Sequence, residues 1–340
     1  MIIEIPTAAD FAASSLNQLH LAWGIVVASI RSYGDSEVLH RNDTPLHEFD
    51  GHDGTRHSIG GPDPRSDDEI RDVEVLFWRR SQPALGNAVS LIQQAVEIAL
   101  KGRIAAISPF LLILREGREL PKPVKGGDIP FSAFRTIDAS DLLRLHNAVV
   151  EPELRMNDKF ATYWEDLRRR RNVIMHSARP SVTDSRLLTS PELAEDIIRI
   201  TLQLHPGKTW YERMVEHGEA DEDAAAHEIL PDINRAFAIR TLSDVVDVVR
   251  PAFAREFLGI DRRRRLYECP NCLAQADRDC LDRDPFPSFA KLVTPPDGPA
   301  TVVCPLCRME SPIILGRCSE DDCRGTVFCV EPHKYVVGLE

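Results

Sequence analysis

The chain has 340 residues, a length that exceeds the needs of one small hydrophobic core and predicts two structural units. Hydrophobic residues make up 43% and charged residues 28% of the chain, a balance typical of a globular protein in water. The formal net charge of -12 argues against a protein that coats nucleic acid with its whole surface, although it leaves room for a local basic groove.

The sequence contains no evident targeting signal. The first residues, MIIEIPTAADF, lack the basic start of a signal peptide and carry Glu4 and Asp10 early. The longest apolar stretch, residues 104–114, contains Ser108 and Pro109 and is too short to cross a bilayer. We therefore expect a cytoplasmic protein with no membrane partner.

Helical periodicity dominates the first 258 residues. Apolar residues recur every three or four positions in segments predicted as helices over 9–33, 82–101, 139–150, 153–177, 191–204, 221–229 and 232–258. Segments 35–67 and 115–130 are rich in Gly, Pro and polar residues and are expected to be loops. The predicted fold class is mainly α: a helical domain over residues 1–258, followed by a small cysteine-rich module of short strands over residues 259–340.

A cluster of polar residues lies in the predicted helix 153–177, where Arg171 and Asn172 precede His176. Cleavage of RNA without a metal requires proton transfer at the 2′- and 5′-oxygens and stabilisation of a negatively charged phosphate. Histidine transfers protons near neutral pH, and arginine binds phosphate through parallel charged hydrogen bonds. Asn172 is suited to orient either the histidine or the phosphate. Neighbouring candidates for substrate binding are Arg168, Arg169 and Arg170.

The spacing of Arg171 and His176 alone is weak evidence, because arginine-rich chains contain such pairs by chance. On spacing alone, a structural explanation is favoured: the arginine reaches solvent along the helix, and the histidine happens to lie near the helix end. Arg171 nevertheless stands in phase with the apolar stripe that contains Trp164 and Leu167. An arginine at such a position is costly unless it has a partner or a task.

Residues 82–205 resemble a HEPN domain, whose ribonuclease members carry arginine and histidine four to six residues apart, usually with Asn, Asp or His after the arginine. Segment 94–102, QAVEIALKG, is similar to the first long helix of that domain. Segment 131–146 is similar to the connecting segment of several HEPN subfamilies. From the residues alone, Glu97 and Lys101 are expected to form a structural ion pair one helical turn apart.

The resemblance implies a HEPN-like helical bundle and a metal-independent endoribonuclease with Arg171, Asn172 and His176 as catalytic residues. At about 100° per residue, positions 171 and 176 lie about 140° apart on a straight helix, so one helix does not bring them together. A two-fold pairing of helices would do so, and the resemblance implies such a composite site in a homodimer. The expected partners are the RNA substrate, a second copy and a regulatory or antitoxin protein, as in bacterial toxins and antiviral effectors.

Two other functions fit the same sequence. Because some HEPN domains lack activity, the first alternative is a non-catalytic HEPN and zinc-ribbon module that binds RNA or a protein partner. The second is a DNA-binding regulator, which the acidic composition disfavours.

All eight cysteines lie between Cys269 and Cys329, a distribution that favours metal binding over disulfides in a chain without a secretion signal. Two Cys-x-x-Cys pairs predict a zinc site of four thiolates, formed by Cys269, Cys272, Cys304 and Cys307. Such a site has no open coordination position, so the zinc is expected to be structural and to take no part in catalysis. This segment resembles zinc ribbons.

The remaining cysteines are candidates for a second metal site, formed by Cys280, Cys318, Cys323 and Cys329. An alternative pairing joins Cys304 and Cys307 to Cys318 and Cys323 instead, and the sequence leaves this choice open. The structural explanation, reduced thiols buried in a core, accounts poorly for doubled Cys-x-x-Cys pairs.

Overall fold

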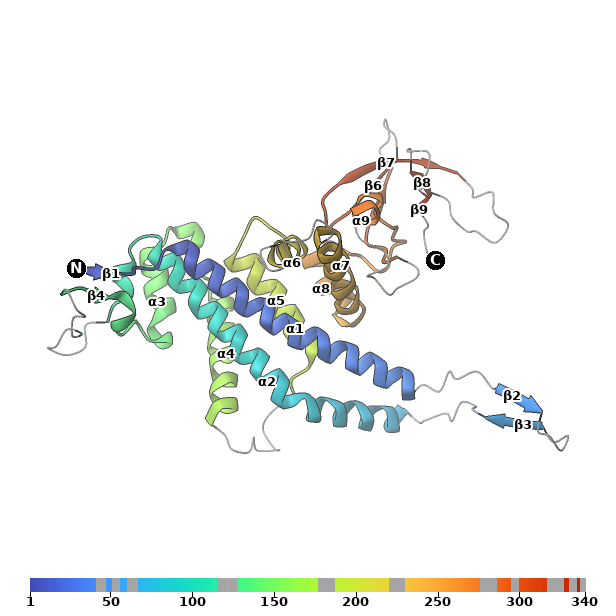
Figure 1. Cartoon of the computed structure of the whole chain (residues 1–340), viewed down its shortest axis with the longest axis horizontal. Coiled ribbons are helices and arrows are strands. Elements are labelled where there is room, and N and C mark those ends of the chain that lie inside the picture. Colours follow the sequence, from blue (N-terminus) through green and yellow to red (C-terminus); the bar gives the residue numbers. More distant parts are fainter. Residues whose placement is uncertain are drawn as a thin grey trace.

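The computed structural model describes residues 1–40, 47–50, 56–59, 67–114, 121, 127–176, 187–219, 230–275, 286–294, 300–316, 327–329 and 335–336. The fold is mainly helical, with a small antiparallel sheet near the C-terminus (Figure 1), as the sequence predicted. In these ranges, no helix is long and apolar enough to cross a membrane.

Two long helices form the spine of the molecule: α1 (Ala8–His40) and α2 (Asp67–Ala105) run side by side in opposite directions (Figure 1). A capping box starts α1, because the Asp10 carboxylate accepts hydrogen bonds from the backbone and side chain of Thr7. The seam between the helices is filled by fully buried residues, among them Leu19, Val26, Leu85, Val89 and Ile92.

Both helices extend beyond their predicted limits of 9–33 and 82–101. Gly34 does not end α1, and Pro83 lies inside α2. A proline removes one backbone hydrogen bond and kinks a helix, but packing against a neighbouring helix can offset that cost. The predicted loop 35–67 is also partly wrong, because it contains the end of α1 and two antiparallel strands, β2 (His47–Asp50) and β3 (Arg56–Ile59).

Three predicted helices are confirmed: α3 (Ala139–Val149), α4 (Asp158–His176) and α5 (Ser190–Leu204). Helix α4 starts later than expected, after a 3-10 turn, Pro152–Leu154. The side-chain oxygen of Asn157 accepts a hydrogen bond from the backbone N–H of Phe160 at 3.0 Å and so caps the first turn. All three helices pack against α2.

The connection between α2 and α3, which contains the predicted loop 115–130, is described only in part. It includes two 3-10 turns, Pro109–Leu112 and Phe131–Ala133. The short strand β4 (Ile129–Pro130) pairs in parallel with β1 (Ile2–Ile3) at the N-terminus. Residues 115–120 and 122–126 lie outside the described residues.

The chain after α5 departs from the prediction. Helix α6 (Trp210–Glu219) was not expected, and the helix predicted at 221–229 lies outside the described residues. The single helix predicted over 232–258 is wrong. Instead, α7 (Leu230–Val248) ends before Pro251, whose ring prevents an uninterrupted helix. A short α8 (Pro251–Phe253) and a π-helical turn (Ala254–Leu258) follow, and Gly259 ends the turn with a φ of 72°.

The C-terminal part contains helix α9 (Pro270–Gln275) and a five-stranded antiparallel sheet whose strands follow chain order. The strands are β5 (Lys291–Val293), β6 (Thr301–Val303), β7 (Glu310–Leu315), β8 (Val327–Cys329) and β9 (Tyr335–Val336). One continuous cluster of buried residues joins this part to the helices, because it includes Leu242 of α7 as well as Cys269 and Val302. The domain boundary at 258–259 stays a prediction.

Candidate functional site

Four cysteines converge between α9 and the strands β6 and β7. Cys269 directly precedes α9, and Cys272 lies in its first turn. Cys304 follows β6, and Cys307 lies in the tight turn before β7. That turn is closed by the N–H of Arg308, which donates to the carbonyl oxygen of Cys304 at 3.0 Å.

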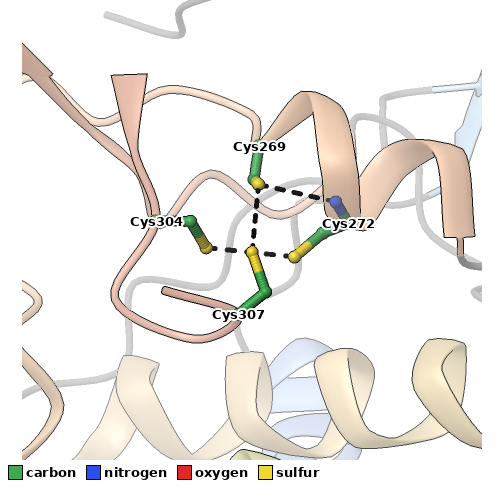
Figure 2. A group of neighbouring side chains, drawn as sticks. All are labelled: Cys269, Cys272, Cys304 and Cys307. Carbon is green, nitrogen blue, oxygen red and sulfur yellow. Dashed lines mark hydrogen bonds between the residues drawn. The ribbon is translucent and has the colours of Figure 1, made fainter. Parts of the chain in front are cut away.

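The geometry of the four sulfur atoms fits a tetrahedral metal site. All four lie within 4.8 Å of one another, and their side chains point toward one centre (Figure 2). The Sγ atoms of Cys269 and Cys307 are 3.6 Å apart, and those of Cys272 and Cys304 are 3.9 Å apart. A zinc–sulfur distance of about 2.3 Å places the corners of a tetrahedron about 3.8 Å apart. These residues can therefore hold a metal ion, as the sequence predicted.

The chemistry of the donor set also suits a bound cation. Cys269, Cys272 and Cys304 are buried and Cys307 is partly buried, and none of them forms a disulfide. Hydrogen bonding with Cys269 raises the pKa of Cys272 and Cys304 and lowers the pKa of Cys307. Four thiolates cannot stay buried together without a positive charge, whereas a bound divalent metal deprotonates its thiol ligands.

The other predicted metal ligands have side chains that the structure does not describe. Cys280, Cys318 and Cys323 lie outside the described residues, and Cys329 ends strand β8. The structure therefore joins Cys304 and Cys307 to the Cys269 pair, the first of the two pairings that the sequence left open.

The Arg-Asn-x3-His segment lies on α4, on the helix that the sequence assigned to it. The apolar stripe of this helix is buried at Phe160, Trp164 and Leu167, and Arg171 continues the stripe as a partly buried residue. Its Nε atom is buried and has no hydrogen-bond partner among the residues that the structure describes. Its Nη1 atom donates to the side-chain oxygen of Asn172 over 3.4 Å, a weak contact.

The three preceding arginines differ from Arg171, because each is paired with an acidic residue of the previous helical turn. Arg168 pairs with Glu165 at 2.9 Å. Arg169 and Arg170 share Asp166, at 3.6 and 2.7 Å. Within the described part of the chain, no carboxylate pairs with Arg171. Surface ion pairs of this kind are weak, so the role of these three arginines in substrate binding stays a prediction.

His176 is the last residue of α4. The structure describes its backbone, and its side chain lies outside the description, as do residues 177–186. The end of α4 is anchored on α2, where Ile174 packs against Gly86. The predicted pair of Glu97 and Lys101 is confirmed at 2.9 Å and serves the structure of α2.

Sequence reasoning missed one titratable residue near α4. Asp196 of α5 is largely buried, and burial raises its pKa to about 6. The nearby Arg199, with a guanidinium nitrogen 3.4 Å away, and Arg170 oppose that shift. An acidic residue among apolar neighbours was its only signal in the sequence, and surface ion pairs give the same signal.

No protein-family model, curated protein or solved structure matches this chain in the three comparisons made. Function is therefore inferred from the chain's own residues.

Proposed function

We propose that the chain is a metal-independent endoribonuclease of the HEPN type, with a HEPN-like bundle over residues 82–205. The observation that carries the proposal is the state of Arg171. Its Nε is buried and lacks a hydrogen-bond partner among the described residues. Among the same residues, the three preceding arginines pair with carboxylates and Arg171 does not. Keeping such a group costs stability. A phosphate that binds the accessible nitrogen atoms of this guanidinium would account for an arginine kept at this position.

The proposed reaction needs only the side chains of α4 and the substrate. The 2′-oxygen of the RNA forms a bond to the adjacent phosphorus, and the bond from phosphorus to the 5′-oxygen breaks. His176 accepts the proton of the 2′-hydroxyl and returns it to the departing 5′-oxygen, since the pKa range of histidine suits proton transfer near neutrality. Arg171 holds the negative charge that develops on the phosphate, and Asn172 orients the phosphate or the histidine.

The active site is proposed to form between two copies of the chain. Positions 171 and 176 diverge by about 140° around one helix, so the arginine of one chain meets the histidine of the other. The exposed side chains of Asn172 and Val173 support this arrangement, because they leave part of α4 available to a second copy. A toxin or antiviral effector with a regulatory or antitoxin partner is the proposed biological role.

The metal in this proposal is a structural Zn²⁺ ion held by the four converging cysteines. Soft thiolates suit zinc, and four protein ligands leave no position for a substrate. Bound zinc would supply folding energy to the surrounding loops. A second ion, held by Cys280, Cys318, Cys323 and Cys329, remains part of the proposal.

The test is incubation of purified protein with total RNA and with a defined single-stranded RNA, without added divalent metal. We expect cleavage by the wild type and its loss in Arg171→Ala and His176→Ala. The matched control is Arg144→Ala on α3, whose side chain is 84% exposed and paired with Asp141, and which should retain activity. Circular dichroism checks that each variant is folded.

The cleavage products provide a second measurement. Attack by the 2′-hydroxyl leaves 2′,3′-cyclic phosphate ends and spares DNA, which lacks this group. Products with 3′-hydroxyl ends, or undiminished cleavage by folded His176→Ala protein, would refute the mechanism. Binding of RNA or a protein without any cleavage would favour the non-catalytic alternative.

A further inference from the structure

Helix α6 is too short to be stable by itself. It has ten residues, and isolated helices shorter than about 12–15 residues are marginal in water. A capping box starts it: the N–H of Glu212 donates to Oγ1 of Thr209 at 3.2 Å, and the N–H of Thr209 donates to Oε2 of Glu212 at 2.6 Å. Its position must therefore depend on contacts with neighbouring parts of the chain.

On one side, α6 contacts the turn of residues 304–307, which carries Cys304 and Cys307 and is named the cysteine turn. The capping carboxylate of Glu212 forms an ion pair with Arg308 at 3.2 Å. Arg308 directly follows Cys307 and has a φ of 60°, a backbone conformation that few non-glycine residues adopt. The geometry of the cysteine turn thus fixes where this guanidinium meets α6.

A second contact joins the same turn to the end of the helical part. Gly259 has a φ of 72°, and a Cβ placed on it would lie 3.2 Å from Cβ of Pro305. Pro305 stands between two neighbours that are buried, Cys304 and Leu306. This close approach requires a residue without a side chain at position 259. It brings the cysteine turn into contact with the π-helical turn.

On its other side, α6 contacts α1 through stacked rings and the end of α5 through hydrogen bonds. The ring of His217 stacks on the ring of His20 in α1, with centroids 3.9 Å apart. Trp210 also stacks on His20, at 4.7 Å. The guanidinium of Arg213 donates to the carbonyl oxygens of His205 and Pro206, which follow the last turn of α5.

From these contacts we infer that metal binding by the four cysteines orders α6 and, through it, the junction of α1 and α5. The metal site is then a structural support of the helical part, beyond its role in the C-terminal module. This inference rests on the metal binding proposed above and does not depend on RNA cleavage.

The test is hydrogen–deuterium exchange of the full-length chain, loaded with zinc or treated with EDTA, with zinc content measured on the same samples. On zinc removal, exchange in α6 should rise at least about tenfold, together with exchange around Cys269 and Cys304. The buried inner part of α2, around Ile92, should stay protected and serves as the internal reference.

A matched pair of variants isolates the proposed link. Glu212→Gln keeps a capping side chain but removes the charge that pairs with Arg308, and we expect about two- to fivefold faster exchange in α6 of the zinc-loaded protein. After zinc removal, α6 of this variant and α6 of the wild type should exchange at the same rate, because the contact between Glu212 and Arg308 is already lost. The control is Glu216→Gln on the same helix, because Glu216 pairs with Lys208 and not with Arg308. This variant should change the exchange rate of α6 by the same factor with and without zinc.

The outcomes separate the inference from the metal site itself. Protein that binds no zinc would overturn both. Zinc that leaves without any change in α6 would overturn the inference alone. If EDTA unfolds the whole chain, the zinc-loaded Glu212→Gln variant decides: faster exchange in α6 supports the inference, and unchanged exchange refutes it.

Discussion

Ile174 of α4 packs against the bare backbone of Gly86 in α2, so closely that a Cβ on residue 86 would lie 3.0 Å from Cγ2 of Ile174. This contact sets the distance between the two helices at the end of α4. Because Arg171 and His176 belong to the same last turns, the contact also positions the residues proposed for RNA cleavage.

We predict that Gly86→Val pushes the end of α4 away from α2, destabilises the protein by about 1–3 kcal/mol and lowers RNA cleavage. Thermal unfolding and initial cleavage rates measure the two effects. The matched control is Gly24→Val, because a Cβ at Gly24 of α1 has no described atom within 4 Å. Valine has a slightly better helix propensity than glycine, so the control should be neutral or mildly stabilising. Equal behaviour of both variants would rule out the packing argument.

The composite active site predicts complementation between two inactive proteins. In a mixed dimer of Arg171→Ala and His176→Ala chains, one site receives an intact arginine and an intact histidine, and the other site receives neither. Random association of co-expressed chains should therefore restore about one quarter of the wild-type activity. Cleavage assays before and after co-expression measure it. If the mixture stays inactive although mixed dimers form, both residues act within one chain or the assignment is wrong.

Elemental analysis tests the number of metal ions. We predict about one zinc ion per purified chain if the four converging cysteines form the only site, and its loss in Cys304→Ser. Cys329→Ser is the control and should retain this ion. Two ions per chain would instead indicate that the four remaining cysteines bind a second ion. The absence of zinc from the wild type would exclude the predicted zinc-binding module.

A buried histidine, His205, and a half-buried one, His20, predict a loss of stability in acid. Burial lowers the pKa of His20 to about 3 and of His205 to about 4, and the charges of His217, Arg213 and Arg103 act in the same direction. In the unfolded chain both groups titrate near the ordinary value of 6.5. Below that pH the unfolded state binds more protons, so the free energy of unfolding falls as the pH falls toward the folded-state values. Each histidine contributes up to about 2 kcal/mol of this loss between pH 6.5 and 5.

Denaturant unfolding at several pH values measures this slope. His20→Phe keeps an aromatic ring between Trp210 and His217 but removes the titrating group, so it should flatten the dependence on pH. The carboxylates titrate in both proteins, and the difference between the two curves isolates the histidine. An unchanged slope in the variant would show that His20 does not titrate as its burial implies.

The sequence alone was sufficient where a pattern is local. Apolar residues at helical spacing predicted α3, α4 and α5, because a helix buries residues three and four apart on one side. The same spacing placed Glu97 and Lys101 in an ion pair. Two Cys-x-x-Cys pairs predicted the metal ligands, because each pair can bind one ion from a single turn.

Tertiary structure decided what local patterns cannot encode. Gly34 and Pro83 did not end their helices, because packing between α1 and α2 outweighs the local preference of single residues. Helix α6 escaped prediction because it packs against α7 and also contacts the cysteine turn and α1, which are far from it in the sequence. Loop closure bridges such separations at modest entropic cost. Arg171 likewise occurs in the sequence as one of four consecutive arginines. Only the folded chain distinguishes it from the other three, because its Nε atom is buried and has no hydrogen-bond partner among the described residues.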